Sequence, residues 1–194
     1  MGRSPCRAAP MTSKGSSRPL SRSYQRRHPG SGAAGCSGAR FEHRKICLVS
    51  ESATENTFLV AQRLAAGQLP PRAREALALG RFTALLKETP PDAPRKVRGI
   101  VAGHTLRRLV ARTLNQQYIG VFDAACSPHQ FALGSRAGTD AAALLVKMSC
   151  EDGRTIVQTD AKGAFDNISR RQMLAELADV APELLPFVEL FYSS

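Results

Sequence analysis

The sequence predicts a mixed α/β (α+β) fold that follows a disordered basic tail. Three observations predict this fold: apolar residues at helical spacing, two short apolar runs joined by a proline-rich loop, and one β-branched run between glycines. With 194 residues, of which 43% are hydrophobic, the chain is long enough for about one domain with a buried core. No apolar run approaches the ~18 residues of a membrane span, so we expect no membrane partner.

The net charge of +11 is concentrated at the N-terminus. Residues 1–45 hold ten Lys and Arg and one acid, Glu42, whereas residues 46–194 have a net charge of only +2. Residues 1–40 are rich in Ser, Gly, Pro and Arg and lack the apolar surface that would offset the entropy cost of ordering. We therefore predict disorder over residues 1–40 and a basic tail over 1–45.

The function of this tail stays open. It suits an arm that binds nucleic-acid phosphates, an organelle transit peptide, a weak nuclear signal at residues 25–28, or a solvated segment without a role. The five cysteines are scattered and form no C-x-x-C pair, which favours a reducing intracellular compartment over a disulfide framework. We expect the nucleus or cytoplasm, with organelle targeting as the alternative.

The first half of the body predicts two helices and a hairpin. A helix is expected over 52–66, and a second over 71–80 begins with a proline, whose missing N–H costs nothing there. Apolar runs over 82–87 and 97–101 predict two antiparallel strands, joined by a proline-containing loop.

The second half predicts helices around one further strand. The pattern over 105–118 is clearly amphipathic, with three arginines off its apolar face, and 120–138 is expected to be irregular. A helix over 140–150 is capped by Thr139, and the β-branched run 154–160 gives the best strand signal in the chain. A capping box at Ser169 starts a helix to about 179, and a last helix runs from 182 through 190.

The strand over 154–160 ends in a carboxylate, Asp160, and a second, Asp166, follows six residues later. A carboxylate at a strand end beside a tight turn suits Mg²⁺, which prefers one or two carboxylates together with substrate phosphates. Aspartate also ends strands for turn chemistry alone, and spacing does not separate the two interpretations.

The run 160–168 resembles motif A of reverse transcriptases, the Asp-x-x-x-Ala-Phe/Tyr-Asp pattern of non-LTR retroelement and group II intron polymerases. Two further blocks occur in that family's order. Lys87, the strand 97–100 and the following helix resemble its fingers motif, Lys…Arg-Pro-Ile, with Gly99 in place of the proline. Residues 128–140 resemble its Gln-x-Gly-Phe-x-x-Gly-Arg-Ser-Thr block, although Ala132 replaces the Gly-Phe region and Ser135 precedes the arginine.

The resemblance implies a partial right-hand polymerase, with the fingers and the first part of the palm over 46–194. Asp160 and the carbonyl of Ala161 would bind metal in two-metal phosphoryl transfer. Phe165 would be the steric gate that selects deoxynucleotides, with a core aromatic as the alternative. Asp166 would be structural and cap the turn before Ser169.

The same resemblance assigns four polar residues to nucleotide and nucleic acid. Lys87 and Arg98 would neutralise the incoming triphosphate, with solvated charge as the alternative, since two nearby basic residues compete for this role. Gln130 and Arg136 would contact the template or primer backbone, with an ordinary surface loop as the alternative. The implied partners are an RNA or DNA template-primer and a dNTP.

The chain contains no Asp-Asp pair, so it lacks the Tyr/Phe-x-Asp-Asp of motif C, which the two-metal site needs. We therefore expect an N-terminal fragment that is catalytically incomplete alone, with Mg²⁺ or Mn²⁺ bound only together with motif C. The alternatives are a non-catalytic nucleic-acid-binding remnant with a basic arm, or an expressed remnant without a selected function.

Overall fold

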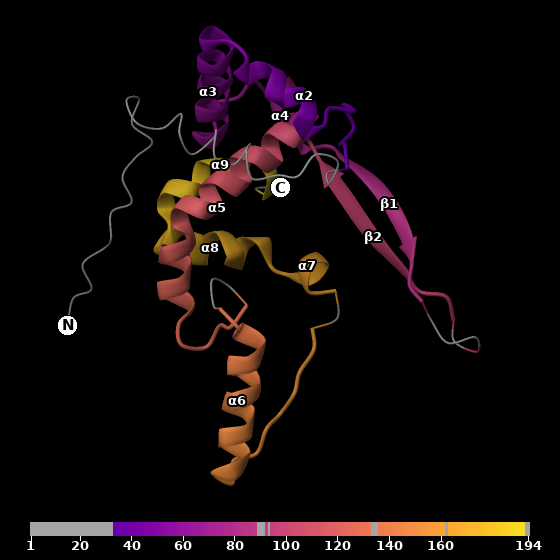
Figure 1. Ribbon diagram of the computed structural model, residues 1–194, viewed down its shortest axis with the longest axis vertical. Helices are drawn as coiled ribbons and strands as arrows, with labels where there is room; N and C mark the ends of the chain where they lie inside the picture. The colour runs from indigo at the N-terminus through magenta and orange to yellow at the C-terminus, as the bar shows by residue number, and fades with distance from the viewer. Residues whose placement is uncertain (1–32, 89–91, 93, 133–135, 162, 193–194) are drawn as a thin grey trace, which may run out of the picture. The chain divides into compact units, whose positions relative to one another are not determined.

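The computed structural model describes residues 33–88, 92, 94–132, 136–161 and 163–192 (Figure 1). The fold is mixed α/β, as predicted: mostly helical, with one two-stranded antiparallel sheet in the described part of the chain. The chain divides into two compact units. In terms of the described residues, the N-terminal unit comprises 33–115 and 186–192, and the C-terminal unit comprises 116–185.

The N-terminal unit begins with short helices. α2 (Phe41–Lys45) and the 3-10 turn η1 (Ile46–Leu48) precede α3 (Glu51–Ala65) and α4 (Pro71–Ala78). Ser50 caps α3, because its hydroxyl accepts a 3.2 Å hydrogen bond from the Ala53 N–H. The two predicted helices are thus confirmed to within two residues, including the proline at the start of α4.

The predicted tail is wrong at its C-terminal end. Residues 41–45 form α2, and Phe41 is only 8% exposed. The apolar content of residues 1–45 is low on average, but one aromatic ring at a helix start is enough to anchor the segment by burial. Residues 33–40 are described and contain no helix or strand, whereas residues 1–32 of the predicted tail lie outside the described residues.

Gly67 ends α3 in a Schellman motif. Its φ is +72°, and the Gln68 N–H donates to the Arg63 carbonyl at 2.8 Å while the Gly67 N–H donates to the Leu64 carbonyl at 3.2 Å. A Cβ at this position would lie 2.8 Å from the Pro186 carbonyl oxygen. Glycine is therefore required both by the left-handed backbone and by the close approach of the start of α9 (Leu185–Tyr192).

The hairpin consists of β1 (Gly80–Leu86) and β2 (Val97–Gly103), which pair antiparallel (Figure 1). The predicted pairing is confirmed: β1 begins two residues and ends one residue earlier than expected, and β2 ends two residues later. The register places Gly80 opposite Gly103 and Leu86 opposite Val97, and the Lys87 N–H continues the pairing to the Lys96 carbonyl at 2.8 Å.

Helix α5 (Thr105–Cys126) supplies most of the buried side chains of the N-terminal unit. The predicted amphipathic pattern over 105–118 is confirmed, because the buried side chains of this segment recur at helical spacing, and four residues of the other helices add to them. The buried residues of this unit are Phe41, Ala61, Leu64, Thr105, Leu106, Leu109, Val110, Thr113, Leu114 and Phe187. The helix continues to Cys126, so the irregular segment expected from 120 onward begins later than predicted.

The C-terminal unit contains α6 (Gly138–Glu151), α7 (Ala164–Asn167), α8 (Arg170–Val180) and the 3-10 turn η2 (Pro182–Leu184). Thr139 lies inside α6 and does not cap it; the cap position is Ala137, which has a left-handed φ of +52°. Ser169 caps α8 as predicted, since its hydroxyl accepts a 3.2 Å bond from the Gln172 N–H. The predicted last helix is divided between η2 and α9.

The strand predicted over 154–160 is wrong. These residues have no regular structure and are exposed throughout, with Ile156 45% and Val157 78% exposed. β-branched residues favour a strand only when a neighbouring strand accepts the backbone hydrogen bonds. In the described residues the only strands are β1 and β2, and these pair with each other.

The described helices include none that is both long and apolar enough to span a bilayer.

We predict that Gly67→Ala destabilises the protein more than Gly38→Ala. Both glycines have a left-handed φ, +72° and +69°, so each alanine costs about 1 kcal/mol in backbone strain. At position 38 a Cβ meets nothing within 4 Å, whereas at 67 it meets the Pro186 backbone. Urea unfolding of both variants should therefore show an additional loss of about 1–2 kcal/mol for Gly67→Ala. Equal losses would contradict the close approach of α3 and α9.

Candidate functional site

The predicted metal ligands lie in an exposed, irregular segment. Asp160 and Ala161 follow the unpaired run 154–159, and both are exposed. The described residues contain no group of three or more His, Cys, Asp or Glu side chains that could hold a metal ion. One carboxylate and one carbonyl do not by themselves make a two-metal site, so these residues alone do not fit the implied Mg²⁺ or Mn²⁺.

Phe165 lies on a short helix that begins directly after a left-handed glycine. Gly163 has a φ of +57°, and its carbonyl accepts hydrogen bonds from the Asp166 and Asn167 N–H groups at 2.9 and 3.0 Å and from the Asn167 side chain at 3.1 Å. Phe165 is 98% exposed, so the alternative of a core aromatic is wrong. Asp166 belongs to the first turn of α7, where a carboxylate is favourable, and the cap of α8 is supplied by Ser169.

The hairpin brings Lys87 and Arg98 to one face. Arg98 pairs with Leu85, and Lys87 lies two residues beyond Leu85, so the two cations are diagonal neighbours on the same side of the ladder. Both are exposed, and within the described ranges neither takes part in an ion pair. Lys96, opposite Lys87, adds a third positive charge to this face. The register therefore produces a concentrated cationic surface that suits phosphate.

Gly99 lies on the other face of the hairpin. A Cβ at this position would lie 2.6 Å from the ring atom Cε2 of Phe82. The Phe82 ring thus occupies the space that a larger residue at 99 would take. This contact gives a structural reason for the glycine that stands where the polymerase pattern has a proline.

Gln130 and Arg136 flank the segment before α6. The side-chain oxygen of Gln130 accepts a 2.7 Å hydrogen bond from the Ala132 N–H, which closes a local turn. Arg136 is exposed and directly precedes Ala137, the residue with positive φ. Their proposed contact with template or primer stays a prediction.

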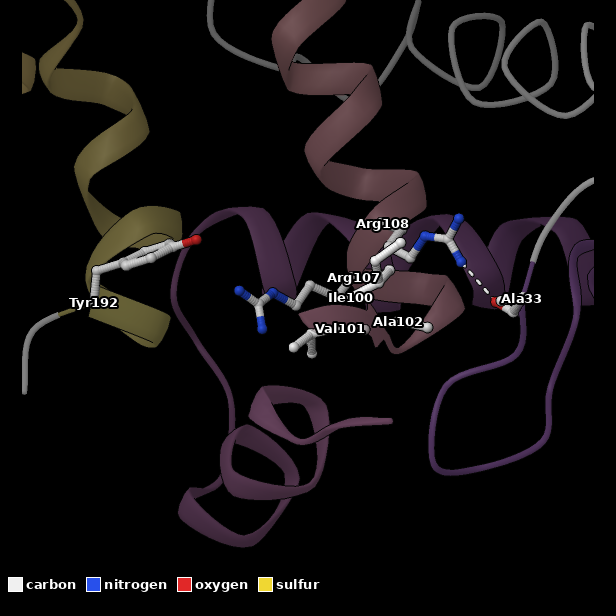
Figure 2. Close-up of a pocket in the computed structure, with 8 residues that line it drawn as sticks. Ala33, Ile100, Val101, Ala102, Arg107, Arg108 and Tyr192 are labelled. Carbon is white, nitrogen blue, oxygen red and sulfur yellow. Dashed lines mark hydrogen bonds between the residues drawn. The ribbon is translucent and has the colours of Figure 1, made fainter. Parts of the chain in front are cut away.

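A pocket of about 460 Å³ lies beside the start of α5, where sequence analysis places no site (Figure 2). Its wall is formed by β2 residues 100–103, together with Ala33, Tyr192, Arg107 and Arg108. The Arg107 guanidinium stacks 3.8 Å from the centroid of the Phe191 ring and donates to the Ala78 carbonyl at 3.4 Å. The sequence signal for this site is a pair of arginines in the first turn of a helix that has no acid there.

Arg108 is held at the opposite end of this pocket. Its guanidinium donates to the Ala33 carbonyl at 2.8 Å and lies 5.3 Å from the centroid of Phe41 (Figure 2). In the described part of the chain, neither pocket arginine pairs with a carboxylate. Two positive charges beside the positive N-terminal end of a helix dipole make this pocket strongly attractive to anions.

The two units carry net charges of opposite sign. Residues 33–115 and 186–192 carry 14 Lys and Arg against seven Asp and Glu, a net charge of +7. Residues 116–185 carry six against nine, a net charge of −3. The net attraction for phosphates and carboxylates is therefore greater in the N-terminal unit and the basic residues of 1–32 than in the C-terminal unit.

His104 caps α5 in its neutral form. Its Nδ1 accepts a 3.3 Å hydrogen bond from the Leu106 N–H, and its carbonyl accepts one from the Arg108 N–H at 3.0 Å. Burial, and secondly the positive charge of Arg44, hold the pKa of His104 below its ordinary value of 6.5. The cap therefore depends on an imidazole that resists protonation.

We compared the chain with protein-family models, curated proteins and solved structures. No family model, curated protein or solved structure matches the chain. The resemblance to reverse transcriptases therefore depends on the motifs and on how the described residues display them.

We predict that the free energy of unfolding decreases as the pH falls from 7.5 to 5.5, and that His104→Asn reduces this decrease. The unfolded chain takes up the His104 proton at a higher pH than the folded chain does, so acidification favours unfolding. Asparagine keeps a capping oxygen but does not titrate. Urea unfolding at several pH values measures both proteins, and parallel pH profiles would contradict the role of His104.

Proposed function

We propose that the chain is the fingers and first palm segment of a reverse transcriptase of the non-LTR retroelement and group II intron type. The activity of the intact fold is template-directed nucleotidyl transfer, in which the primer hydroxyl attacks the α-phosphate of a dNTP and pyrophosphate leaves. The second carboxylate pair of that reaction is not among these 194 residues. The proposal therefore assigns substrate-binding roles to the chain and polymerisation only to the complete polymerase domain.

The observation that carries the proposal is the register of the hairpin. The resemblance requires Lys87 and Arg98, which lie 11 positions apart in this sequence, to reach one triphosphate. Arg98 lies opposite Leu85, and Lys87 directly follows β1 and continues the pairing to Lys96, so the two cations lie diagonally on one face, which supports a shared polyphosphate ligand. A shift of one residue in the register would place one of them on the opposite face, so the pairing supports a shared ligand.

Two residues of the segment that resembles motif A, Asp160 and Phe165, are exposed to solvent, which supports the proposal. Phe165 follows a tight turn and presents an almost fully exposed ring, which suits contact with a sugar and not with the core. Asp160 lies on the approach to that turn and is exposed to solvent. In the intact family these two residues would face the same nucleotide, and Asp160 would hold a divalent metal only together with the second carboxylate pair.

We predict that Lys87→Gln and Arg98→Gln each weaken the binding of a fluorescent dNTP by about threefold to tenfold at low ionic strength. Each change removes one charge-assisted contact with phosphate at an exposed position. Arg81→Gln is the matched control, because Arg81 lies on the same face at the other end of the hairpin, opposite Ala102. Fluorescence anisotropy measures all three variants.

The Arg81→Gln control distinguishes a triphosphate site from general attraction to a basic surface. Arg81→Gln should bind the dNTP within about twofold of the unaltered protein, since a distant exposed charge adds little. An equal loss in all three variants would indicate general attraction to the basic unit and would contradict a triphosphate site. The corresponding deoxynucleoside monophosphate should bind more weakly than the triphosphate.

A second candidate function is non-catalytic nucleic-acid binding, and the charge asymmetry favours it. Residues 1–32 contain seven Lys and Arg and no acid, and the N-terminal unit adds a further +7. Such a binder neutralises phosphates without base readout, so its affinity depends steeply on salt.

We predict that changing the seven basic residues of 1–32 to Gln makes the salt dependence of RNA binding much shallower. Each phosphate that the variant no longer neutralises reduces the log–log slope by about 0.7 for a single strand, so a difference of several phosphates is easily measured. Filter binding at four or more salt concentrations gives the slope. An unchanged slope would assign binding to the N-terminal unit alone and exclude the basic arm.

A further inference from the structure

In the described part of the chain the outer edge of β2 has no partner strand, although the Gly35 backbone approaches its end, where a Cβ on Gly35 would lie 2.9 Å from the Gly103 carbonyl oxygen. The sheet has two strands, so β2 pairs on one side only, with β1. The pocket of about 460 Å³ lies along four consecutive residues of this strand, 100–103 (Figure 2). Alternate backbone N–H and C=O groups of an edge strand point away from its partner and are available to another extended chain.

The side chains around this edge favour an anionic and partly apolar occupant. Ile100 is 44% and Val101 63% exposed, which leaves apolar surface uncovered. Arg107 and Arg108 lie toward the two ends of the pocket (Figure 2), and contacts with Phe191, Ala78, Ala33 and Phe41 hold their guanidinium groups in place. Held guanidinium groups bind carboxylates with a smaller entropy loss than mobile ones.

We propose that this pocket binds an extended peptide segment of another protein that carries carboxylates between apolar residues. Its backbone adds a strand to β2, its apolar side chains lie on one face of that strand, beside the exposed Val101, and its carboxylates pair with Arg107 and Arg108. Such a site is distinct from the triphosphate face proposed above, because Lys87 and Arg98 do not line the pocket.

The positive charge of the pocket favours an acidic peptide over the chain's own basic N-terminal residues. Residues 1–32 have a net charge of +7 and contain no acid, so they would bring further positive charge to two arginines that lack carboxylate partners among the described residues. A nucleic acid would satisfy the charges but could not add a strand to the β2 edge. The backbone edge therefore favours a peptide over a phosphate polymer.

The test uses the full chain and a fluorescein-labelled peptide of about eight residues that alternates Val and Glu. In an extended strand alternate N–H groups point to the same side, so N-methylation of all Val or of all Glu residues blocks one side only. Neither modification changes the charge of the peptide. We expect one N-methylated peptide to bind at least about tenfold more weakly and the other within about threefold of the unmodified peptide.

Two variants of the protein locate the site. Arg107→Gln should weaken binding by about tenfold, because it removes a charge-assisted contact while the stem of the side chain remains. Arg112→Gln is the matched control: it lies on the same helix but does not line the pocket, and its affinity should be unchanged. Thermal melts confirm that both variants are folded, and Arg108→Gln repeats the test if Arg107→Gln is not.

Three results would overturn the proposal. The first is equal binding of the two N-methylated peptides, which would mean that charge alone attracts them. The second is an equal effect of Arg107→Gln and Arg112→Gln. The third is displacement of the peptide by a single-stranded oligonucleotide whose own binding depends on Arg107, which would identify the pocket as a nucleic-acid site.

Discussion

The first turns of α5 are the constraint on which the rest of the N-terminal unit depends. One face of these turns is buried and supplies Leu106, Leu109 and Val110 to the core. The other side chains fix the chain around it: Thr105 donates to the Ala39 carbonyl, and Arg107 stacks on Phe191. Segments that lie far apart in sequence are thereby held against one helix. The hairpin follows the same constraint, because only His104 separates β2 from α5.

This arrangement concentrates positive charge where it is electrostatically unfavourable. Arg107 and Arg108 lie at the N-terminal end of a helix, where the dipole is already positive, and no acid accompanies them in the first turn. Stacking on aromatic rings and hydrogen bonds to carbonyl groups offset part of the cost without neutralising the charge. The unit therefore retains an attraction for anions on the hairpin face and in the pocket, which links its packing to both proposed binding roles.

Sequence reasoning succeeded where structure is local and failed where it depends on distant partners. The periodicity after Thr105 and the capping residue Ser169 both predicted their helices, because a helix satisfies its own backbone hydrogen bonds. The strand predicted over 154–160 is absent, because a strand requires a neighbouring strand, which the composition of the run does not reveal. The burial of Phe41 was missed for the same reason, because Arg108, whose guanidinium lies 5.3 Å from the ring centroid, is far away in sequence.

The sequence by itself determined most of the longer helices, the antiparallel hairpin and the residues that resemble a polymerase motif, since each of these follows from local pattern. Only the tertiary structure decided that Lys87 and Arg98 share a face, that Phe165 is exposed, and that Arg107 and Arg108 line a pocket. It also divided the charge into a basic and an acidic unit. The reason is physical: local backbone preferences act within a few residues, whereas burial, register and electrostatic environment are set by segments that meet only after folding.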